Sequence, residues 1–369
     1  MPKQRKKSLV FVQNCISPHQ MPYIEALSRR SDVEHVWVVA PRVTYSDRAA
    51  MGWPATWTTS SERLTIVIAP NDKQMAELYA MPECVCLFSG ISAFPEILHW
   101  FRLSIPYRLK RGIITEAPYT YDKPLWMHQL RFALMDWRYV KYFDYVFAIG
   151  EDCVKYYRLW SKRWNVIPFM YCTSPSSLLE ASASSRPHAL AVCFVGSLDR
   201  RKNVGELLSA VDILRKRKVE VAVSIVGDGP LRDALEQQAS TIVSDSVSID
   251  FLGALPMPET QRVMVANDVL VLPSLHDGWG AVINEAMSMG TLPVCSNKCG
   301  AKDIVKLSGF GGVYDVGNPD MLADVLQAVA TNINNVRDKR AERVKWAIDN
   351  ISPDAVGELM MTTIKDNMP

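Results

Sequence analysis

Short, largely apolar runs recur along this chain at intervals that leave room for one helix between neighbours. In the first 170 residues the runs are Leu9–Val12, His35–Ala40, Leu64–Ile68, Cys84–Phe88, Gly112–Thr115 and Tyr145–Ile149. Runs of this length are typical of strands, and strands separated by helix-sized intervals usually pair in parallel. The pattern therefore predicts an α/β fold with a parallel sheet of Rossmann type.

The alternation breaks once, at residues 172–188, where serine is abundant and proline stands near both ends. Such a composition is typical of a linker. The alternation then resumes, with strands predicted at 191–195, 219–226 and 247–251 and helices at 204–217, 231–239, 258–266 and 321–332. A length of 369 residues also suits two domains better than one core. We therefore expect an N-terminal domain over 1–171, the linker 172–188, a C-terminal domain over 189–345, and a helical segment 346–369 that could pack back on the N-terminal domain.

The bulk composition disfavours several classes of protein. Hydrophobic residues make up 48% and charged residues 22% of the chain, which is typical of a folded globular protein. A net charge of +2 gives no reason to expect nucleic acid as a partner. No stretch of about 18 apolar residues occurs, so we expect no membrane span. The eight cysteines are scattered without the spacing of a metal site, which predicts reduced, buried thiols in a cytoplasmic protein and no bound metal.

The stretch 267–296 carries the clearest candidate for a binding site. Val269–Leu272 is predicted as a strand, a glycine-containing loop follows, and a helix is predicted from Ala281. Asp277 and Glu285 are eight positions apart, which on a helix corresponds to up to ~12 Å along the axis and an offset of ~80°. Both can face one elongated ligand, and the free amides and helix dipole between them favour an anion such as a diphosphate. A sugar nucleotide fits this pattern, although an acid near a helix start can also be an ordinary cap.

Two further strand ends in the second half bear on the same ligand. The run G-S-L-D-R-R-K-N at 196–203 places Arg201 and Lys202 after a strand, where they could bind phosphate oxygens. Exposed pairs of this kind are, however, often only solvated. The turn V-G-D-G-P-L at 226–231 is not the G-x-G-x-x-G fingerprint, because proline and leucine fill positions that a dinucleotide needs open. A nicotinamide dehydrogenase is therefore disfavoured.

Taken in order, five motifs resemble the group 1 (family 4) glycosyltransferases of the GT-B fold: G-S-L-D-R-R-K-N, V-G-D-G-P-L, F-L-G-A-L-P, D-V-L-V-L-P-S and D-G-W-G-A-V-I-N-E-A-M-S-M-G-T-L-P-V. The resemblance is specific over residues 190–330. In the first half it depends on the α/β pattern and the loop S-P-H-Q-M-P-Y. It implies two Rossmann-like domains facing each other across a cleft, with a nucleotide-sugar donor held mainly by the C-terminal one. It also implies sugar transfer with retention of configuration, without a catalytic metal or any cofactor beyond the donor.

The resemblance implies roles for individual residues of the second half. Glu285 matches the acid that binds the donor's ribose hydroxyls, and Asp277 matches the acid that contacts the transferred sugar. Arg201 and Lys202 match the cations on the diphosphate. The other donor-binding residues that the resemblance implies are Gly196, Ser197, Gly253, Ala254, Leu255, Gly278, Trp279, Gly280 and Ala281. Two positions depart from the family, since Asp277 stands where glutamate is usual and Ser197 where a further arginine is common.

In the first half, ligands of an open α/β sheet are expected at the carboxyl ends of the strands. The loops at those ends are 14–20, 89–92 and 116–119. His19 and Glu116 are the catalytic candidates on the acceptor side, because His19 could bind or deprotonate an acceptor hydroxyl. The alternatives are a histidine that satisfies loop carbonyls and a glutamate that caps a turn. No residue stands out as a covalent nucleophile, which fits the front-face displacement often proposed for the resembled family.

Residues 98–142 combine basic side chains with tryptophan. The basic residues are Arg102, Arg108, Lys110, Arg111, Lys123, Arg131, Arg138 and Lys141, opposed by Glu116, Asp122 and Asp136. The aromatic residues interleaved with them include Trp100, Phe101, Trp126 and Trp137. Such a mixture is typical of a helix on an anionic bilayer, so a peripheral membrane contact is one interpretation. A solvated helix with buried aromatic residues is the other.

These observations lead to one functional hypothesis and two alternatives. The hypothesis is a cytoplasmic, retaining hexosyltransferase resting on the inner membrane surface. It would move a sugar from a UDP- or GDP-type donor to a lipid-linked or saccharide acceptor in surface polysaccharide biosynthesis. One alternative is a sugar-nucleotide epimerase with the same GT-B architecture. The other is a non-catalytic subunit that binds a sugar nucleotide, as the departures at Asp277 and Ser197 suggest.

Overall fold

The computed structural model describes residues 5–46, 56–57, 59, 61–91, 93–117, 124–131, 133–134, 137–160, 165–173 and 190–366. The chain divides into two compact units. The first comprises Met1–Cys172 together with Ser352–Pro369, and the second comprises Thr173–Ile351. The segment predicted as a linker lies outside the described residues except for Cys172 and Thr173.

The first unit is built on a seven-stranded parallel sheet in the order β3-β2-β1-β4-β5-β6-β7. Its strands are β1 (Lys7–Val12), β2 (Val33–Ala40), β3 (Leu64–Ile68), β4 (Cys84–Ser89), β5 (Lys110–Glu116), β6 (Tyr145–Ile149) and β7 (Asn165–Phe169). The six predicted runs form the first six strands. The seventh was not predicted because Pro168 interrupts a short run. At the edge of a sheet such a proline is tolerated, since its missing N–H faces away from the ladder.

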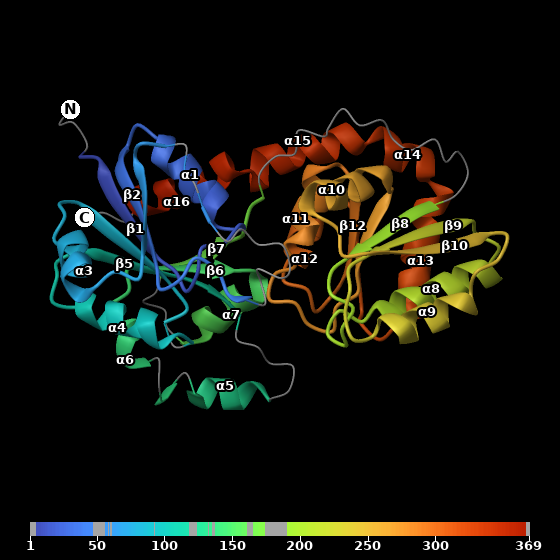
Figure 1. Cartoon of the computed structure of the whole chain (residues 1–369), viewed down its shortest axis with the longest axis horizontal. Coiled ribbons are helices and arrows are strands. Elements are labelled where there is room, and N and C mark those ends of the chain that lie inside the picture. Colours follow the sequence, from blue (N-terminus) through green and yellow to red (C-terminus); the bar gives the residue numbers. More distant parts are fainter. Residues whose placement is uncertain are drawn as a thin grey trace. The chain divides into compact units, whose positions relative to one another are not determined.

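Helices on either side bury the faces of this sheet (Figure 1). The helices of this unit are α1 (Met21–Arg29), α3 (Asp72–Tyr79), α4 (Pro95–Ser104), α5 (Leu125–Arg131), α6 (Trp137–Val140), α7 (Glu151–Trp160) and α16 (Pro353–Asp366), of which α5 stands apart from the sheet. A proline in the first turn of α1 and of α4 has the backbone angle that a helix start needs. Trp100 and Phe101 of α4 pack with Phe88 of β4 in one hydrophobic cluster. These two aromatic residues of the window 98–142 therefore belong to the core.

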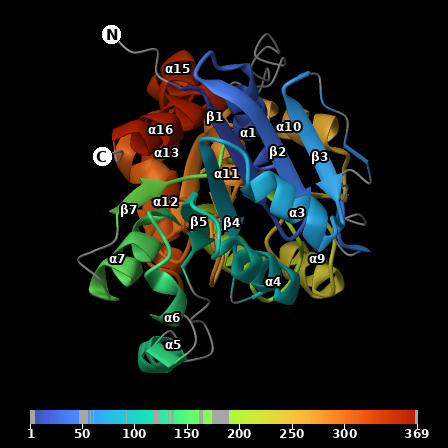
Figure 2. The ribbon, with the colours of Figure 1, turned by 90° about the vertical axis from the view of Figure 1, so that its left-hand side faces the viewer.

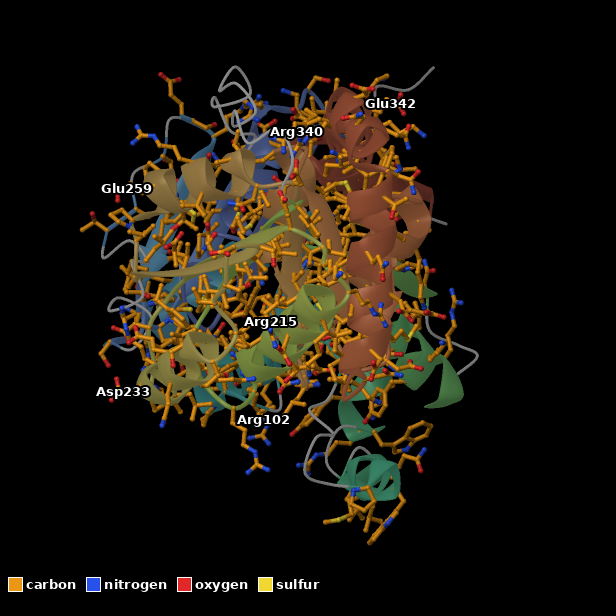
Figure 3. All side chains as sticks on the ribbon, turned by 90° about the vertical axis from the view of Figure 1, so that its right-hand side faces the viewer. Arg102, Arg215, Asp233, Glu259, Arg340 and Glu342 are labelled. Atoms are coloured by element: carbon orange, nitrogen blue, oxygen red, sulfur yellow. The ribbon has the colours of Figure 1, made fainter. Side chains whose placement is uncertain are left out.

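The second unit is built on a six-stranded parallel sheet in the order β10-β9-β8-β11-β12-β13. Its strands are β8 (Leu190–Val195), β9 (Val221–Val226), β10 (Val247–Gly253), β11 (Val269–Leu272), β12 (Leu292–Ser296) and β13 (Gly312–Tyr314). Its helices are α8 (Val204–Lys216), α9 (Arg232–Ser240), α10 (Met257–Ala266), α11 (Val282–Ser288), α12 (Lys302–Ser308), α13 (Pro319–Thr331), α14 (Ile333–Asp338) and α15 (Arg340–Ile351). Charged residues on the outer helices, such as Asp233 and Glu259, point to solvent (Figure 3).

Both sheets reverse their strand order at one point, between β1 and β4 in the first unit and between β8 and β11 in the second. The prediction of two Rossmann-like units is confirmed. In such sheets the loops that follow the two strands at the reversal diverge and leave room for a ligand. The candidate residues in the loops after β8 and β11 are therefore brought to one place by the topology.

The composition-based predictions can be compared with the described residues. All eight cysteines are buried and none forms a disulfide, as predicted. Among the described helices none combines the length and hydrophobicity needed to cross a membrane. In the same part of the chain, no three His, Cys, Asp or Glu side chains gather closely enough to hold a metal ion.

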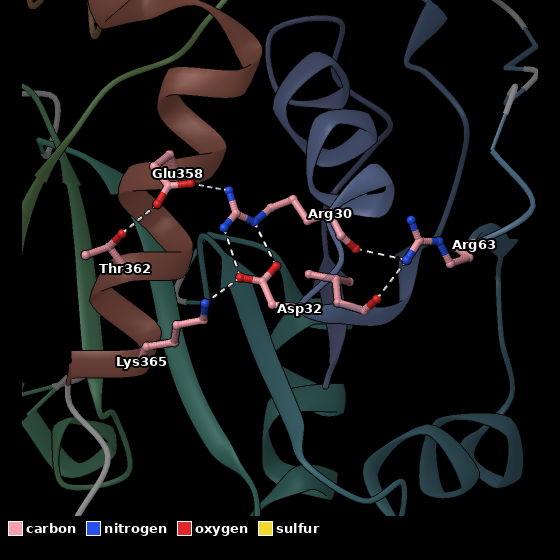
Figure 4. A network of polar contacts seen from close by, with 7 residues as sticks. Arg30, Asp32, Arg63, Glu358, Thr362 and Lys365 are labelled. Carbon is pink, nitrogen blue, oxygen red and sulfur yellow. Dashed lines mark hydrogen bonds and ion pairs between the residues drawn. The ribbon is translucent and has the colours of Figure 1, made fainter. Parts of the chain in front are cut away.

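The last helix, α16, belongs to the first unit although it follows the second unit in the sequence, and it packs along α1 (Figure 2). The guanidinium of Arg30, at the end of α1, donates two hydrogen bonds of 2.9 Å to the carboxylate of Asp32. Lys365 Nζ of α16 lies 2.6 Å from Asp32 Oδ2, and Glu358 of α16 pairs with Arg30 (Figure 4). Two cations and two carboxylates thus fix α16 to the first unit.

Asp32→Asn should weaken the attachment of α16. The hydrogen bonds from Arg30 hold the pKa of Asp32 far below its ordinary value of 3.8. The carboxylate therefore stabilises the fold above that ordinary value, and the stabilisation is lost as the pH falls below it. We expect the free energy of unfolding at pH 7 to fall by about 1–3 kcal/mol. Urea unfolding near pH 7 and near pH 3 should show a larger difference between variant and wild type at the higher pH.

Asp354→Asn is the matched control for this test. Asp354 also lies on α16, but its side chain is 83% exposed and its contact with Arg29 measures 3.6 Å. Exposed pairs of this kind contribute little, so the control should unfold like the wild type. Equal losses in the two variants would contradict the role of Asp32.

Candidate functional site

Glycines hold the loops after β8, β9 and β10 together at the carboxyl edge of the second sheet. Gly196 N donates to the last carbonyl of β9 at 3.0 Å, and Gly227 N donates to Gly253 O at 2.8 Å. Gly227 has a φ of +136°, and a Cβ there would lie 1.8 Å from the carbonyl oxygen of Gly196. Only glycine fits such a close approach. Ala254 and Leu255 follow Gly253 directly, so these predicted donor-binding residues lie along one edge.

The loops after β8 and β11 meet through an ion-pair cluster. Lys202 Nζ lies 2.5 Å from Asp277 Oδ2, and an Nη atom of Arg201 lies 3.5 Å from the same oxygen. The Lys202 and Asp277 side chains are 12% and 13% exposed, whereas that of Arg201 is 43% exposed. The structure therefore brings the adjacent cations Arg201 and Lys202 to Asp277, which lies 75 positions after Lys202 in the sequence.

Asp199 fixes the backbone that carries these cations. Its carboxylate accepts hydrogen bonds from Lys202 N at 2.9 Å and from Ser197 Oγ at 2.7 Å. Partial burial acts to raise the pKa of Asp199, but the hydrogen bonds and the nearby cations outweigh it and the pKa is lowered. The Ser197 hydroxyl is thus engaged within the loop, at the position where the resembled family commonly has a further arginine.

Asp277 is held in place by the loop after β12. Its N–H donates to Lys298 O at 3.1 Å, and its carbonyl accepts from Gly300 N at 3.0 Å. Gly280 has a φ of +89°, and a Cβ there would lie 2.7 Å from Cys299 Sγ. Position 280 therefore requires glycine. Backbone hydrogen bonds to the loop after β12 thus hold the loop that carries Asp277.

The loop between the two acids offers open backbone donors. In the described structure the N–H groups of Gly278, Gly280 and Ala281 donate no hydrogen bond. The indole of Trp279 is buried and donates to Asn284 Oδ1 at 2.7 Å, so Trp279 can present only its backbone to a ligand. The helix α11 begins one residue later than predicted and has seven residues. The loop amides, more than the dipole of so short a helix, are therefore what can bind an anion.

Glu285 lies in the first turn of α11. Its side chain is partly exposed, yet the surrounding protein desolvates it and raises the pKa of its carboxyl to about 7. Within the described part of the chain this carboxyl forms no hydrogen bond or ion pair. A poorly solvated carboxylate without a protein partner destabilises a fold, and such groups are typical of functional sites. A ligand with hydroxyl groups would satisfy it.

A second polar cluster lies at the carboxyl edge of the first sheet. Tyr171 Oη donates to Glu116 Oε1 at 2.9 Å, and the ring centroids of Tyr171 and His19 are 6.3 Å apart. Gln13 Nε2 donates to Gln20 Oε1 at 2.7 Å, and Gln20 also hydrogen-bonds to Tyr171. The structure thus joins His19 and Glu116, which were predicted separately. Tyr171 was missed because its only sequence signal is its place just after β7, which was itself not predicted.

The protonation state of Tyr171 determines which group donates in its hydrogen bond with Glu116. Burial, together with the nearby Glu116 carboxylate, raises the pKa of Tyr171 well above its ordinary value. The phenol therefore stays protonated and keeps donating to Glu116. Gln13 is 1% exposed, and its Oε1 has no hydrogen-bond partner in the described structure. Of the loops predicted at this edge, Ser92, Pro118 and Tyr119 lie outside the described residues.

The second unit also matches a known family of proteins. Residues 179–346 match the family model for glycosyl transferases group 1. This part of the chain belongs to the group 1 glycosyltransferases. The match covers the motifs after β8, β9, β10 and β11, and it confirms the resemblance inferred from them.

Two curated relatives share sequence with part of this chain. An uncharacterized glycosyltransferase of Methanocaldococcus jannaschii is 28% identical over 172 residues, which is 45% of this chain and 43% of that protein. The 2-deoxystreptamine glucosyltransferase of Streptomyces kanamyceticus is 36% identical over 136 residues, which is 35% of this chain and 31% of that protein. The chain therefore matches less than half of the length of each relative.

Solved structures resemble the chain over both units. Anabaena HepE in complex with UDP has a TM-score of 0.70 at 13% identity and covers 97% of this chain and 100% of its own. The lipopolysaccharide outer core galactosyltransferase WaaB, in its apo form, has a TM-score of 0.70 at 13% identity and covers 98% of this chain and 100% of its own. These likenesses confirm the predicted GT-B fold.

Proposed function

We propose that this protein transfers a sugar from a nucleotide diphosphate donor to an acceptor hydroxyl, with retention of configuration. The observation that carries the proposal is the cluster of Lys202, Arg201 and Asp277, with the unpartnered Glu285 eight positions further on. Two cations suit the two phosphates of a donor, and two acids suit the hydroxyls of its ribose and its sugar. The second unit would therefore hold the donor.

The same residues suit the chemistry of the transfer. When the bond between the sugar and the diphosphate breaks, negative charge grows on the leaving phosphate. Lys202 and Arg201 would stabilise this charge, and the open amides of Gly278 and Gly280 would add hydrogen-bond donors. Before the donor binds, Asp277 keeps Lys202 in position. Because side chains supply the positive charge, the proposed mechanism uses no divalent metal.

The proposal also includes a class of donor, a class of acceptor and a cellular location. A UDP-sugar is the first choice because HepE was solved with UDP and with UDP-glucose, and a GDP-sugar is the alternative. We propose a saccharide or lipid-linked acceptor, as in surface polysaccharide biosynthesis, since WaaB is named for lipopolysaccharide synthesis. A cytoplasmic site is supported by the eight unbridged cysteines.

On the acceptor side, we assign the cluster of the first unit. Glu116 would accept a hydrogen bond from the acceptor hydroxyl, and His19 would contact a neighbouring group of the acceptor. Tyr171 is a positioning residue, because it holds one oxygen of Glu116 through a hydrogen bond of 2.9 Å. The leaving phosphate of the donor would help to take the proton, as is proposed for the resembled family.

Nucleotide binding tests the donor part directly. Thermal unfolding of the whole chain with UDP, GDP or ADP should show a higher midpoint with at least one of them. A ligand at 100 times its Kd that binds only the folded protein adds about 2.7 kcal/mol of stability. A flat response to all three nucleotides and to their sugars would contradict the proposal.

Turnover assays then separate the remaining functions. Glu116→Gln is the matched control, since it lies in the first unit and should keep the nucleotide-induced rise while transfer to the acceptor falls. Epimerised donor in the absence of acceptor would identify a sugar-nucleotide epimerase. Tight nucleotide binding without turnover on any acceptor would identify a non-catalytic binding subunit.

A further inference from the structure

Five large exposed apolar side chains lie in one short stretch of the first unit. Trp126, Met127, Leu130, Leu134 and Trp137 are each between 40% and 70% exposed. Elsewhere in the described chain, large exposed apolar side chains are scattered singly or in twos. Scattered ones need no explanation, whereas a contiguous group marks a surface that contacts another molecule.

The helix α5 carries three of these side chains, those of Trp126, Met127 and Leu130. In Figures 1 and 2 it stands apart from the sheet and from α4. Leu134 follows α5 in the sequence, and Trp137 is the first residue of α6. The exposed apolar side chains therefore come from two helices and the short segment between them in the sequence.

Cations without carboxylate partners lie close to these apolar residues in the sequence. Arg102, Arg108, Arg138 and Lys141 are exposed, and none forms an ion pair with a described residue. The guanidinium carbons of Arg102 and Arg138 lie 5.7 and 5.0 Å from the ring centroid of Tyr139. Arg102 also donates to Tyr139 Oη at 2.6 Å and projects from the edge of the molecule in Figure 3. Two like charges held over one ring repel each other, and an anion would relieve that repulsion.

Lys110 and Arg111, two other cations of the window, have partners within the fold. Lys110 Nζ lies 2.9 Å from Asp144 Oδ1, and the buried Arg111 donates to backbone carbonyls such as that of Tyr107 at 2.7 Å. Among the basic residues of 98–142 whose side chains the structure describes, Lys110 and Arg111 thus have partners, whereas Arg102, Arg108, Arg138 and Lys141 are exposed without an ion pair. The exposed cations accompany the exposed tryptophans, while Trp100 and Phe101 remain in the core.

We propose that α5, together with the exposed cations Arg102, Arg108, Arg138 and Lys141, binds the surface of an anionic bilayer. Tryptophan and leucine at 51% to 61% exposure on α5 suit the boundary between headgroups and acyl chains. Basic side chains beside them suit anionic headgroups. A protein partner with an apolar groove would use the exposed apolar side chains but would leave four unpaired cations unexplained. The proposal does not depend on glycosyl transfer, because lipid binding is measured without donor or acceptor.

Sedimentation of the whole chain with vesicles tests this proposal. The wild type should sediment with equal mixtures of phosphatidylcholine and phosphatidylglycerol, and binding should weaken with added salt. Arg102→Gln with Arg138→Gln should weaken binding about 25-fold, since each basic residue near an anionic surface contributes about fivefold. Trp126→Ser with Leu130→Ser should weaken binding to the mixed vesicles even at low salt.

Matched substitutions outside the face should bind vesicles like the wild type. Lys73→Gln removes an exposed cation of α3, and Leu307→Ser removes an apolar side chain of α12 that is 67% exposed. Thermal unfolding of each variant shows whether the fold is retained. The proposal is overturned if the wild type does not bind anionic vesicles, or if the two double variants bind them as well as the controls do. It is also overturned if the wild type self-associates without lipid and the same double variants abolish that association.

Discussion

Glu285→Gln is expected to remove most of the sugar transfer while making the protein more stable at alkaline pH. The amide is close in shape to the carboxylate, so packing around α11 should be kept. It lacks the charge that would strengthen hydrogen bonds from the donor's hydroxyls. Loss of two charge-assisted hydrogen bonds should lower transfer about 100-fold or more. A residue that serves only the fold would lose stability on substitution, whereas this one should gain it.

The gain in stability follows from the pKa of the carboxyl. Folding raises it from 4.5 to about 7, so the unfolded chain releases this proton at a lower pH than the folded protein does. The free energy of unfolding therefore declines as the pH rises from 4.5 to 7 and stays lowered above 7. A shift of this size corresponds to about 3 kcal/mol, and partial solvent access reduces the expected effect to about 1–3 kcal/mol. Glutamine carries no charge, so the free energy of unfolding of the variant does not fall for this reason as the pH rises.

Unfolding by urea near pH 5 and near pH 8 measures the effect. The advantage of the variant over the wild type should grow with pH. Glu259→Gln is the matched control, because Glu259 also lies in the first turn of a helix of the second unit but is exposed. The control should keep full transfer and unfold like the wild type. Near-normal turnover by Glu285→Gln would refute the assigned role.

Lys202→Met is expected to lower transfer about 100- to 1000-fold, which is the usual effect of removing one donor that stabilises developing negative charge. Methionine keeps the length of the side chain but cannot pair with a diphosphate. The nucleotide-induced rise in unfolding temperature should shrink in parallel. Arg201→Met should have a smaller effect, because Arg201 is 43% exposed and solvent screens its charge.

The ion pair between Lys202 and Asp277 can also be tested by measuring the free energy of unfolding. Lys202→Met leaves Asp277 with a weaker partner at 13% exposure, so the variant should also lose about 1–3 kcal/mol of stability. Asp277→Asn in the same chain should restore part of that stability without restoring transfer. A double-mutant cycle with both substitutions isolates the coupling between the two side chains. A larger loss of transfer from Arg201→Met than from Lys202→Met would contradict the assignment.

The prediction of the fold from the sequence was close because the signals were local. Runs such as Leu9–Val12 and Val269–Leu272 are apolar on both faces, as a strand inside a parallel sheet must be. The errors fall where that signal is weak. Pro168 concealed β7, and β13 has only three residues. The helix after Asp277 begins one residue late because Ala281 serves as its N-cap.

The candidate site was only partly predictable. The motifs around Lys202, Asp277 and Glu285 could be read directly from the sequence, since their residues are close neighbours within each motif. Their relation to one another could not, because the pairing of Lys202 with Asp277 depends on the strand order of the sheet. The same holds for Tyr171 and Glu116, which lie 55 positions apart.

By itself the sequence determined the two Rossmann-like units, the family of the second unit and the residue types available for a diphosphate and its hydroxyls. These depend on periodicity and short motifs, which are properties of neighbouring residues. Only the tertiary structure decided which carboxylate holds Lys202, that Glu285 lacks a partner, and which tryptophans of 98–142 are exposed. Burial and pairing arise when distant segments pack together, and the free energy of a charged or apolar side chain depends on those distant neighbours.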